Sequence, residues 1–188
     1  MSPHRSKMLV HVCCAGCSPH VIDLLQQDYQ VTGYFYNPNI HPEEEYELRL
    51  MEMKKLAEKL GVELFWGEYD ADRWFTLTEG LEKESEGGPR CQICFRMRLE
   101  RAARFAKENE FNNFTTTLTI SPHKNAVVIN RIGGEIEVQS GVNFLRTDFK
   151  KRNGFKKTVE LSKKYWLYRQ DYCGCLYSRE ERERIRRG

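Results

Sequence analysis

Seven cysteines in three clusters are the residues of this sequence whose type and spacing best suit chemistry. The clusters are Cys13, Cys14 and Cys17; Cys91 and Cys94; and Cys173 and Cys175. A short apolar run precedes the first cluster, which is typical of a first strand and not of a secretion signal, so we expect a cytoplasmic protein. Thiols stay reduced in that compartment. The clusters therefore predict metal binding or redox chemistry rather than a disulfide framework.

Two of the clusters together form a ligand set for a metal. Cys91 and Cys94 have Cys-x-x-Cys spacing at the start of an expected helix, and two more thiols come from the end of an expected strand. Four thiolates bind either a structural zinc ion or an iron-sulfur cluster, and the spacing alone does not choose between them. Structural zinc usually holds together small domains without a core, whereas this chain is long enough to form one. A cluster in a substrate crevice is therefore favoured.

The third cluster, Cys173-Gly174-Cys175, has a different character. Two cysteines separated by one residue can close into a small, strained disulfide, and glycine best tolerates the backbone that this requires. Strained disulfides are easily reduced and tend to be redox-active. The same spacing equally suits two further metal ligands or two buried apolar thiols.

The composition predicts one globular domain. The chain has 188 residues, of which 40% are hydrophobic, and no apolar run approaches the length of a membrane span. We expect a single catalytic domain over residues 1–188, with a helical, basic extension from about 155 to 188. The net charge is only +3, so the basic runs in the C-terminal third are local features.

Short β-rich runs alternate with helical periods, which predicts a doubly wound parallel sheet of the α/β class. Strands are expected at residues 7–12, 31–39, 62–70, 111–119 and 142–149. Helices are expected at residues 18–29, 41–61, 90–109, 121–138 and 156–168. The segment 72–89 has an aromatic start and an acidic, Gly-rich finish, and the finish is typical of a mobile surface loop.

Polar and thiol side chains follow four of these strands. They are Cys13, Cys14 and Cys17; Asn37 and Asn39; Asp70 and Asp72; and Ser121 to Lys124. The carboxyl ends of parallel strands form the binding crevice of such sheets, so these residues should converge there. The first crossover carries CCAGCS where a PP-loop ATPase has a Gly- and Ser-rich phosphate loop, and no Rossmann or Walker motif is present. ATP and NAD sites are therefore not expected.

Six stretches together resemble one known family. They are HVCCAGCSPH, GYFYNPNIHPEEEYELR, CQICFRMRLERAA, TTTLTISPHKN, DFKKRNGF and LYRQDYCGCLYS. Each is weak alone, but in this order and spacing they are specific, and they run along nearly the whole chain. On these stretches the chain resembles the cobalamin-independent epoxyqueuosine reductases, the QueH family.

The resemblance implies an oxidoreductase that catalyses the last step of queuosine synthesis. Epoxyqueuosine in tRNA is reduced to queuosine, and its epoxide oxygen leaves as water. The implied substrate is tRNA with a GUN anticodon, and an external donor supplies the electrons. The implied fold is similar to the adenine-nucleotide alpha-hydrolase-like (HUP) and PP-loop proteins, with cysteines in place of the phosphate loop. No cobalamin is expected.

The resemblance also implies roles for the cysteines. The implied ligands of a 4Fe-4S cluster are Cys13, Cys14, Cys91 and Cys94, and the implied redox-active disulfide joins Cys173 and Cys175. Adjacent side chains such as Cys13 and Cys14 rarely point at one small cluster. An alternative therefore stays open, in which one of the two, with Cys17 or Asp70, holds a mononuclear iron beside the cluster.

A tRNA substrate needs aromatic side chains that stack on bases and cations that pair with phosphates. The candidates for RNA contacts are Tyr36, Asn37, Arg49, Lys124, Lys150 and Arg169. Most such aromatics are core residues in any fold, so this set is an expectation. Binding that weakens strongly with salt would follow from phosphate contacts.

Overall fold

The fold is built on one parallel sheet, described here from a computed structural model that places residues 5–187. The strands are β1 (Ser6–His11), β2 (Tyr29–Phe35), β3 (Glu63–Trp66), β4 (Asn113–Thr116) and β5 (Asn143–Phe144). Their order in the sheet is β3-β2-β1-β4-β5, and all neighbouring pairs are parallel. The predicted α/β fold with a parallel sheet is confirmed.

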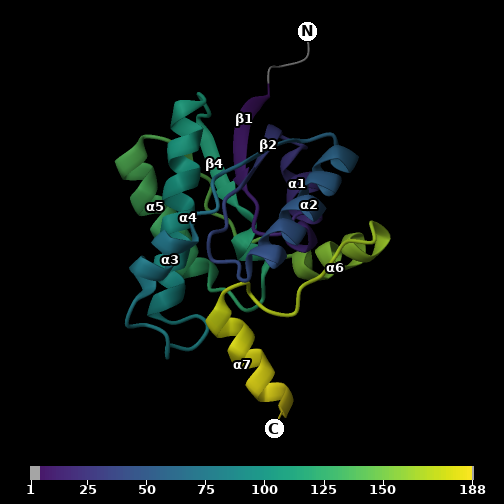
Figure 1. Ribbon diagram of the computed structural model, residues 1–188. Coiled ribbons are helices and arrows are strands. Elements are labelled where there is room, and N and C mark those ends of the chain that lie inside the picture. The colour runs from purple at the N-terminus through teal and green to yellow at the C-terminus, as the bar shows by residue number, and fades with distance from the viewer. Residues whose placement is uncertain (1–4, 188) are drawn as a thin grey trace.

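Helices cover both faces of this sheet, with α3, α4 and α5 on one face and α1, α2 and α6 on the other (Figure 1). The helices are α1 (Pro19–Leu25), α2 (Glu43–Leu60), α3 (Ala71–Thr78), α4 (Pro89–Glu108), α5 (Ala126–Ser140), α6 (Gly154–Lys164) and α7 (Leu176–Arg187). Two short 3-10 turns, η1 (Ala15–Cys17) and η2 (Thr117–Ile120), follow β1 and β4. The sheet is therefore doubly wound, as predicted.

Strand β1 lies at the centre of the sheet and is buried on both sides. Leu9 packs into the core beneath α4 and α5, whereas Met8 and Val10 pack into the core on the opposite face. This alternation follows from the two-residue period of a strand. From β1 the chain adds β2 and β3 on one side of the sheet and then adds β4 and β5 on the other side. In such folds a crevice opens at this switch point between β1 and β4. The first cysteine cluster follows β1 at this position.

The aromatic start of the segment 72–89, for which no element was predicted, forms a helix. Helix α3 spans Ala71–Thr78, and its Trp74 is only 1% exposed. Burial of this large indole against His41 and Tyr177 stabilises the helix. The sequence did not predict this helix, because its apolar face is short and acidic, Gly-rich residues follow it directly.

Most element boundaries differ from the prediction by a few residues, and two of the differences bear on the site. Helix α5 begins after Asn125, whose side-chain oxygen accepts hydrogen bonds from the amides of Val127 and Val128, and not at Ser121. Strand β5 comprises only Asn143–Phe144, because β4 is its only neighbour and pairs over two residues. The residues between β4 and α5 are thus free to line the edge of the sheet.

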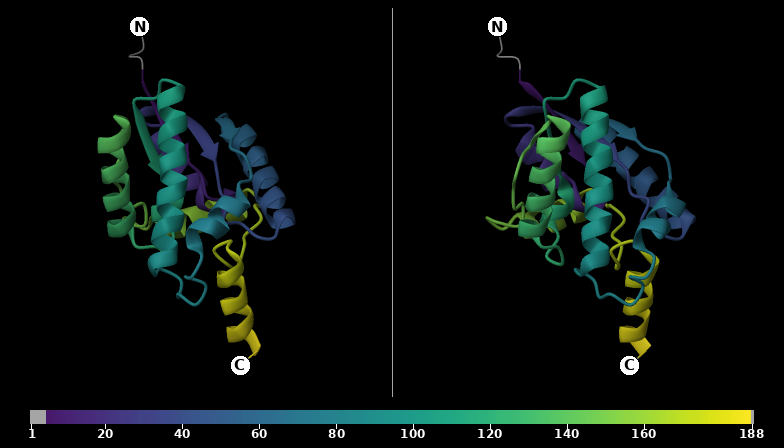
Figure 2. Two further views of the ribbon diagram at one scale, coloured as in Figure 1. Left: turned by 60° about the vertical axis from the view of Figure 1, so that its left-hand side comes forward. Right: turned by 90° about the vertical axis from the view of Figure 1, so that its left-hand side faces the viewer.

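The C-terminal third does not form one uniform extension. Helix α6 packs on α1 and η1, so it belongs to the layer that covers the sheet. Helix α7 projects away from the sheet, as two further views show (Figure 2). Among residues 5–187, no helix has the length and apolar character that crossing a membrane requires.

Candidate thiol centre at the carboxyl edge of the sheet

The predicted convergence at one edge of the sheet is confirmed for two of the four strand ends. A cavity of about 270 Å³ opens there, and three thiols, Cys13, Cys17 and Cys173, line it. Its other lining residues are Glu86, Arg98, Ser121, Pro122, His123, Lys124, Phe155, Arg169, Gln170, Asp171, Tyr172 and Arg182. The residues that follow β1 and β4 therefore meet the loop that precedes α7.

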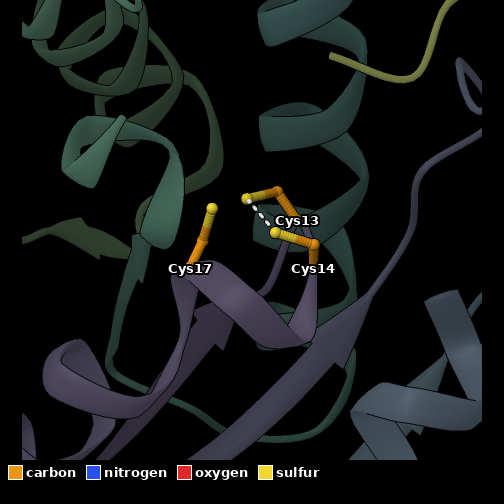
Figure 3. A group of neighbouring side chains, drawn as sticks. All are labelled: Cys13, Cys14 and Cys17. Atoms are coloured by element: carbon orange, nitrogen blue, oxygen red, sulfur yellow. Dashed lines mark hydrogen bonds between the residues drawn. The ribbon is translucent and has the colours of Figure 1, made fainter. Parts of the chain in front are cut away.

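The first cluster is the tightest group of thiols. The sulfur atoms of Cys13, Cys14 and Cys17 all lie within 4.8 Å of one another, and Figure 3 shows them turned toward a common point. Cys14 has an extended backbone (φ −171°, ψ 161°), and the 3-10 turn after it brings Cys17 back beside the pair. Adjacent cysteines thus do point the same way here, because the chain turns directly after them.

Hydrogen bonds and cations favour a thiolate at Cys13. Hydrogen bonds from the Cys14 and Cys17 thiols lower the pKa of Cys13, and the charges of Arg98 and Lys124 lower it further. The hydroxyl of Thr117 also donates to the Cys13 sulfur at 3.2 Å. The same hydrogen bond to Cys13 raises the pKa of Cys14 to about 12. Negative charge in this group is therefore centred on Cys13, one of its two thiols that line the cavity.

The other four thiols form a second group. Cys91 and Cys94 lie in the first turns of α4, as predicted, and the amide of Gly87 donates to the Cys91 sulfur at 3.2 Å. Burial raises the pKa of Cys91 to about 12, and the neighbouring charges of Cys173, Cys94 and Cys175 raise it further. The start of α4 and the Cys-Gly-Cys loop are thus close enough to influence each other's charge.

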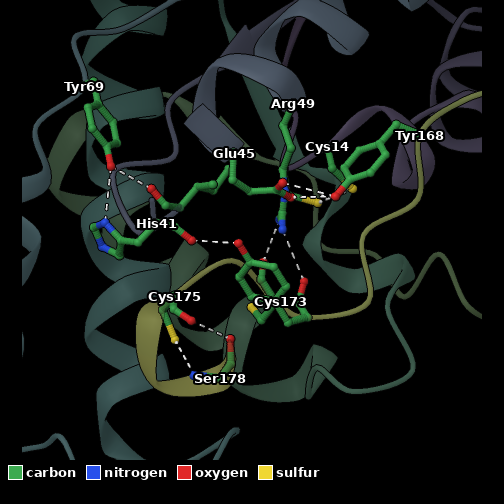
Figure 4. A network of polar contacts seen from close by, with 12 residues as sticks. Cys14, His41, Glu45, Arg49, Tyr69, Tyr168, Cys173, Cys175 and Ser178 are labelled. Atoms are coloured by element: carbon green, nitrogen blue, oxygen red, sulfur yellow. Dashed lines mark hydrogen bonds and ion pairs between the residues drawn. The ribbon is translucent and has the colours of Figure 1, made fainter. Parts of the chain in front are cut away.

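Long-range hydrogen bonds hold the Cys173-Gly174-Cys175 loop in place (Figure 4). The guanidinium of Arg49 donates to the carbonyl of Cys173 at 3.0 Å, and the amide of His41 donates to the carbonyl of Gly174 at 2.8 Å. Gly174 has φ +136°, and a Cβ there would lie 3.1 Å from Arg49 Nη1. Only glycine therefore fits between the two cysteines. All seven thiols are free in the structure, so the disulfide stays a prediction.

Arg49 is itself fixed by a carboxylate. It is 1% exposed, and its Nε donates to Glu45 one helical turn earlier at 2.7 Å. Glu45 also accepts a hydrogen bond from the hydroxyl of Tyr168, in the segment that leads to the loop (Figure 4). The buried charge is thus paired and hydrogen-bonded, as burial requires.

Arg98 joins the two thiol groups, and sequence reasoning missed it. It is 2% exposed, and its Nη1 lies 3.9 Å from the sulfur of Cys94 while Nη2 donates to the side-chain carbonyl of Asn37. It also borders the cavity beside Cys13. Its position four residues after Cys94 on a helix is the signal that would have placed it on the same face.

Asp70 is not brought to the thiols. Its carboxylate accepts a hydrogen bond from Tyr36 at 3.3 Å and lies 4.0 Å from Arg73. Within residues 5–187, the only group of three or more Cys, His, Asp or Glu ligand atoms that lie together is Cys13, Cys14 and Cys17. The structure therefore gives Asp70 no place beside that triad, whereas Cys17 is part of it.

Three of the expected RNA contacts are buried. Tyr36 and Arg49 are 1% exposed and Asn37 is fully buried, so these side chains are not on a surface that RNA can reach. The prediction failed because hydrogen bonds inside the protein use all three. Lys124 and Arg169 do line the cavity.

Lys150, the sixth expected contact, has a structural role. Its ammonium donates to the carbonyls of Thr119 and Lys124, at 3.0 and 3.2 Å, and lies 3.1 Å from Asp148. These bonds hold the segment that follows β4 against the cavity. Lys150 thus helps to position Lys124.

Two solved structures have a similar fold. One is the U34-tRNA thiolase NcsA from Methanococcus maripaludis with its [4Fe-4S] cluster, with a TM-score of 0.59, 15% identity, and coverage of 93% of this chain and 62% of that one. Another is a predicted subunit of a tRNA methyltransferase from Methanocaldococcus jannaschii, with a TM-score of 0.55, 15% identity, and coverage of 81% and 74%. These likenesses confirm the PP-loop-like fold.

Sequence comparisons identify the family. The profile described as "Epoxyqueuosine reductase QueH" matches residues 8–181. Curated relatives named epoxyqueuosine reductase QueH come from Streptococcus pyogenes serotype M1 (39% identical, over 93% of this chain and 71% of that protein) and Histophilus somni (42%, over 94% and 74%). The relative from Thermotoga maritima is 38% identical over 93% of this chain and 91% of its own length. This chain therefore belongs to the epoxyqueuosine reductase QueH family.

Proposed function

We infer that this chain is an epoxyqueuosine reductase, an oxidoreductase that acts on tRNA. The reaction consumes two electrons and two protons, breaks both carbon–oxygen bonds of the epoxide, forms an alkene and releases the oxygen as water. Family membership supports this reaction, because the chain matches relatives named epoxyqueuosine reductase over most of their length. We further propose that the substrate is tRNA with a GUN anticodon, that an external donor supplies the electrons, and that the reaction is cytoplasmic.

One observation carries the proposal at the level of the site. Thiols that lie far apart in the sequence, Cys13, Cys17 and Cys173, line a single cavity at the carboxyl edge of the sheet. Cations accompany them, because Arg98, Lys124 and Arg169 line the same cavity. A reductive reaction needs electron-rich ligands and positive charge beside the group that leaves. The cavity supplies both.

The chemistry of the donors fits an iron-sulfur cluster. We propose that Cys13 and Cys14 with Cys91 and Cys94 hold a 4Fe-4S cluster, which supplies electrons one at a time when bound. Amide and hydroxyl donors already point at two of these sulfurs, as such ligands require. Buried Arg98, close to Cys94 and Cys13, offsets the negative charge of the thiolates.

Cys17 is proposed as a ligand of a second iron next to the cluster. The sulfurs of Cys13, Cys14 and Cys17 lie within 4.8 Å of one another, so Cys17 is close enough to hold such an iron together with one of that pair. Asp70 is left out of this proposed site because its contacts lie elsewhere.

Cys173 and Cys175 are proposed as a redox-active pair. Cys173 lines the cavity, whereas Cys175 is 6% exposed and accepts a hydrogen bond from the amide of Ser178 at 3.4 Å. A dithiol in this place can hold two protons and two electrons, which it returns on closing to a disulfide. The hydrogen bonds to the carbonyls of Cys173 and Gly174 keep the pair oriented.

The test is turnover on isolated tRNA. The protein is purified without oxygen, mixed with epoxyqueuosine-containing tRNA and a chemical reductant, and the digested nucleosides are separated by mass. We expect queuosine, with a loss of one oxygen atom. A Ser121→Ala variant, altered at the rim of the cavity without loss of a thiol, serves as the matched control. No queuosine from protein that carries its full complement of iron would contradict the proposal.

A further inference from the structure

One segment of the chain has a larger net positive charge than the whole chain. Residues 150–169 contain eight Lys or Arg residues and one Glu, a net charge of +7, whereas the whole chain carries +3. The cations are Lys150, Lys151, Arg152, Lys156, Lys157, Lys163, Lys164 and Arg169. The remaining residues are net acidic, so this segment is the part of the chain that attracts a polyanion most strongly.

Helix α6 presents these charges outward because its inner face is made of small residues. Gly154, Thr158 and Ser162, spaced by four, are the buried residues of the helix. The hydroxyl of Ser162 donates to the carbonyl of Gly16 at 2.9 Å, next to Cys17. The lysines therefore face solvent, as the 77% exposed Lys156 shows. The helix that carries the basic face is thus fixed, through its inner face, against the turn that carries the first thiol cluster.

Trp166 follows α6 and is the most exposed large hydrophobic residue described, at 91%. Its amide donates to the carbonyl of Lys163 and the next amide donates to Ser162, at 3.1 and 3.0 Å. This pair of bonds ends the helix with a left-handed residue, a place where glycine is preferred, and Trp166 has φ +56°. Neither packing nor backbone preference explains a tryptophan here. By contrast, the 52% exposed Trp66 lies under the ammonium of Lys54 at 3.7 Å.

The basic face and Trp166 adjoin the cavity. Trp166 is three residues from Arg169, which lines the cavity, and three extended residues span at most ~11 Å. Phe155, at the other end of α6, lines the cavity as well. A nucleotide strand with one base in the cavity can therefore place a neighbouring base over Trp166.

We propose that the α6 platform, defined as Lys156, Lys157, Lys163, Lys164 and Trp166, binds the single-stranded loop of the RNA substrate. Trp166 stacks on a base beside the one that enters the cavity, and the lysines pair with phosphates. Exposed aromatics with interleaved cations are the usual surface for unpaired bases. That the RNA is a tRNA anticodon loop rests on the proposed function.

The test combines RNA affinity with protein stability. An unmodified anticodon stem-loop with a GUN anticodon is titrated into wild type, Trp166→Gly and Trp166→Phe. We expect Trp166→Gly to weaken binding roughly tenfold or more, the range for loss of one stacked base. Its melting temperature should be equal or higher, because glycine suits the left-handed position. Trp166→Phe should restore most of the affinity.

A charge variant tests the phosphates separately. The double variant Lys163→Gln, Lys164→Gln should reduce the slope of log affinity against log salt by about 1.4, or 0.7 for each lost contact to a single strand. The control is Lys54→Gln with Lys55→Gln, two lysines of α2 outside the platform. An unchanged salt slope in the platform variant would overturn the phosphate contacts.

The outcomes separate this inference from the proposed function. If wild type reduces epoxyqueuosine in tRNA and Trp166→Gly binds the stem-loop with unchanged affinity, the platform is wrong and the function stands. If wild type does not turn over but Trp166→Gly weakens RNA binding, the platform stands without that function. If Trp166→Gly changes the oligomeric state of the protein in solution and leaves RNA affinity unchanged, Trp166 belongs to a protein–protein interface, which overturns the RNA platform.

Discussion

The two groups of thiols are assembled in different ways. Cys13, Cys14 and Cys17 come from five consecutive residues that follow a central strand, and a short turn is enough to bring their sulfurs together. The second group joins the start of α4 to a loop some eighty residues later. That loop is held by hydrogen bonds from Arg49 and His41, which lie on a third part of the chain.

This difference separates the first group, which is rigid, from the Cys173–Cys175 loop, which depends on distant supports. The first group follows a buried strand with neighbours on both sides, so its geometry is part of the core. The loop of the second group relies on a few polar contacts, whose loss would free it without disturbing the sheet. A metal centre requires the first kind of support. A dithiol that opens and closes suits the second.

The largest expected effect comes from removing Arg49. Arg49→Met leaves the carboxylate of Glu45, which is 12% exposed, without its ion-pair partner, and we expect a loss of about 3–5 kcal/mol in the free energy of unfolding. The Cys173–Cys175 loop should become reactive toward thiol reagents while Cys13, Cys14 and Cys17 keep their metal. Denaturant unfolding and thiol labelling measure both. Equal labelling of Cys173 in wild type and variant would show that Arg49 does not support the loop.

The second prediction concerns pH and His41, whose amide and carbonyl hold the loop. Burial lowers the pKa of His41 to about 4, below its ordinary 6.5. Its Nδ1 lies 3.2 Å from the Tyr69 hydroxyl, and its Nε2 is buried without a partner, so protonation is unfavourable in the fold.

Between pH 6.5 and about 4 the unfolded state binds the proton and the folded state does not, so stability falls as the pH falls. The loss should reach about 3 kcal/mol at the lower end. His41→Gln should remove this dependence, as measured by denaturant midpoints at several pH values. Parallel pH curves for wild type and variant would contradict it.

The third prediction tests the residue that joins the two groups. Arg98→Met removes a buried positive charge beside the thiolates, worth about 2 kcal/mol at roughly 8 Å in a medium of dielectric constant about 20. We expect the midpoint potential of the proposed cluster to fall by roughly 60–90 mV. Potentiometric EPR titration measures it. Arg98→Lys, which keeps the charge, should lie close to wild type, and a drop of equal size there would assign the effect to geometry.

The smallest expected effect lies within the first group. Thr117→Val removes the hydroxyl that donates to the Cys13 sulfur but keeps the side-chain shape. One hydrogen bond contributes about 1 kcal/mol, so the midpoint potential should fall by roughly 40 mV. Thr115→Val, whose hydroxyl donates to the carbonyl of Leu145 instead, is the matched control. Equal shifts in both variants would mean that the hydrogen bond to sulfur does not tune the centre.

Features set by neighbours in sequence were predictable, and features set by distant contacts were not. The apolar run of β1 and the cysteines after it predicted the position of the first thiol group. The burial of Tyr36, Asn37 and Arg49 depends on partners 25 to 124 residues away, so they were mistaken for RNA contacts. Helix α3 was missed because its stability comes from Trp74 packing against other elements.

The contrast between the two groups is tested most directly by iron content. Iron and EPR of the reduced protein would be measured for wild type, Cys13→Ser, Cys173→Ser and Cys175→Ser, together with turnover on epoxyqueuosine-containing tRNA. We predict that Cys13→Ser loses iron and activity, whereas Cys173→Ser and Cys175→Ser lose activity but keep the iron and the signal of wild type. Loss of iron from the Cys173 and Cys175 variants would make these residues metal ligands and contradict the division.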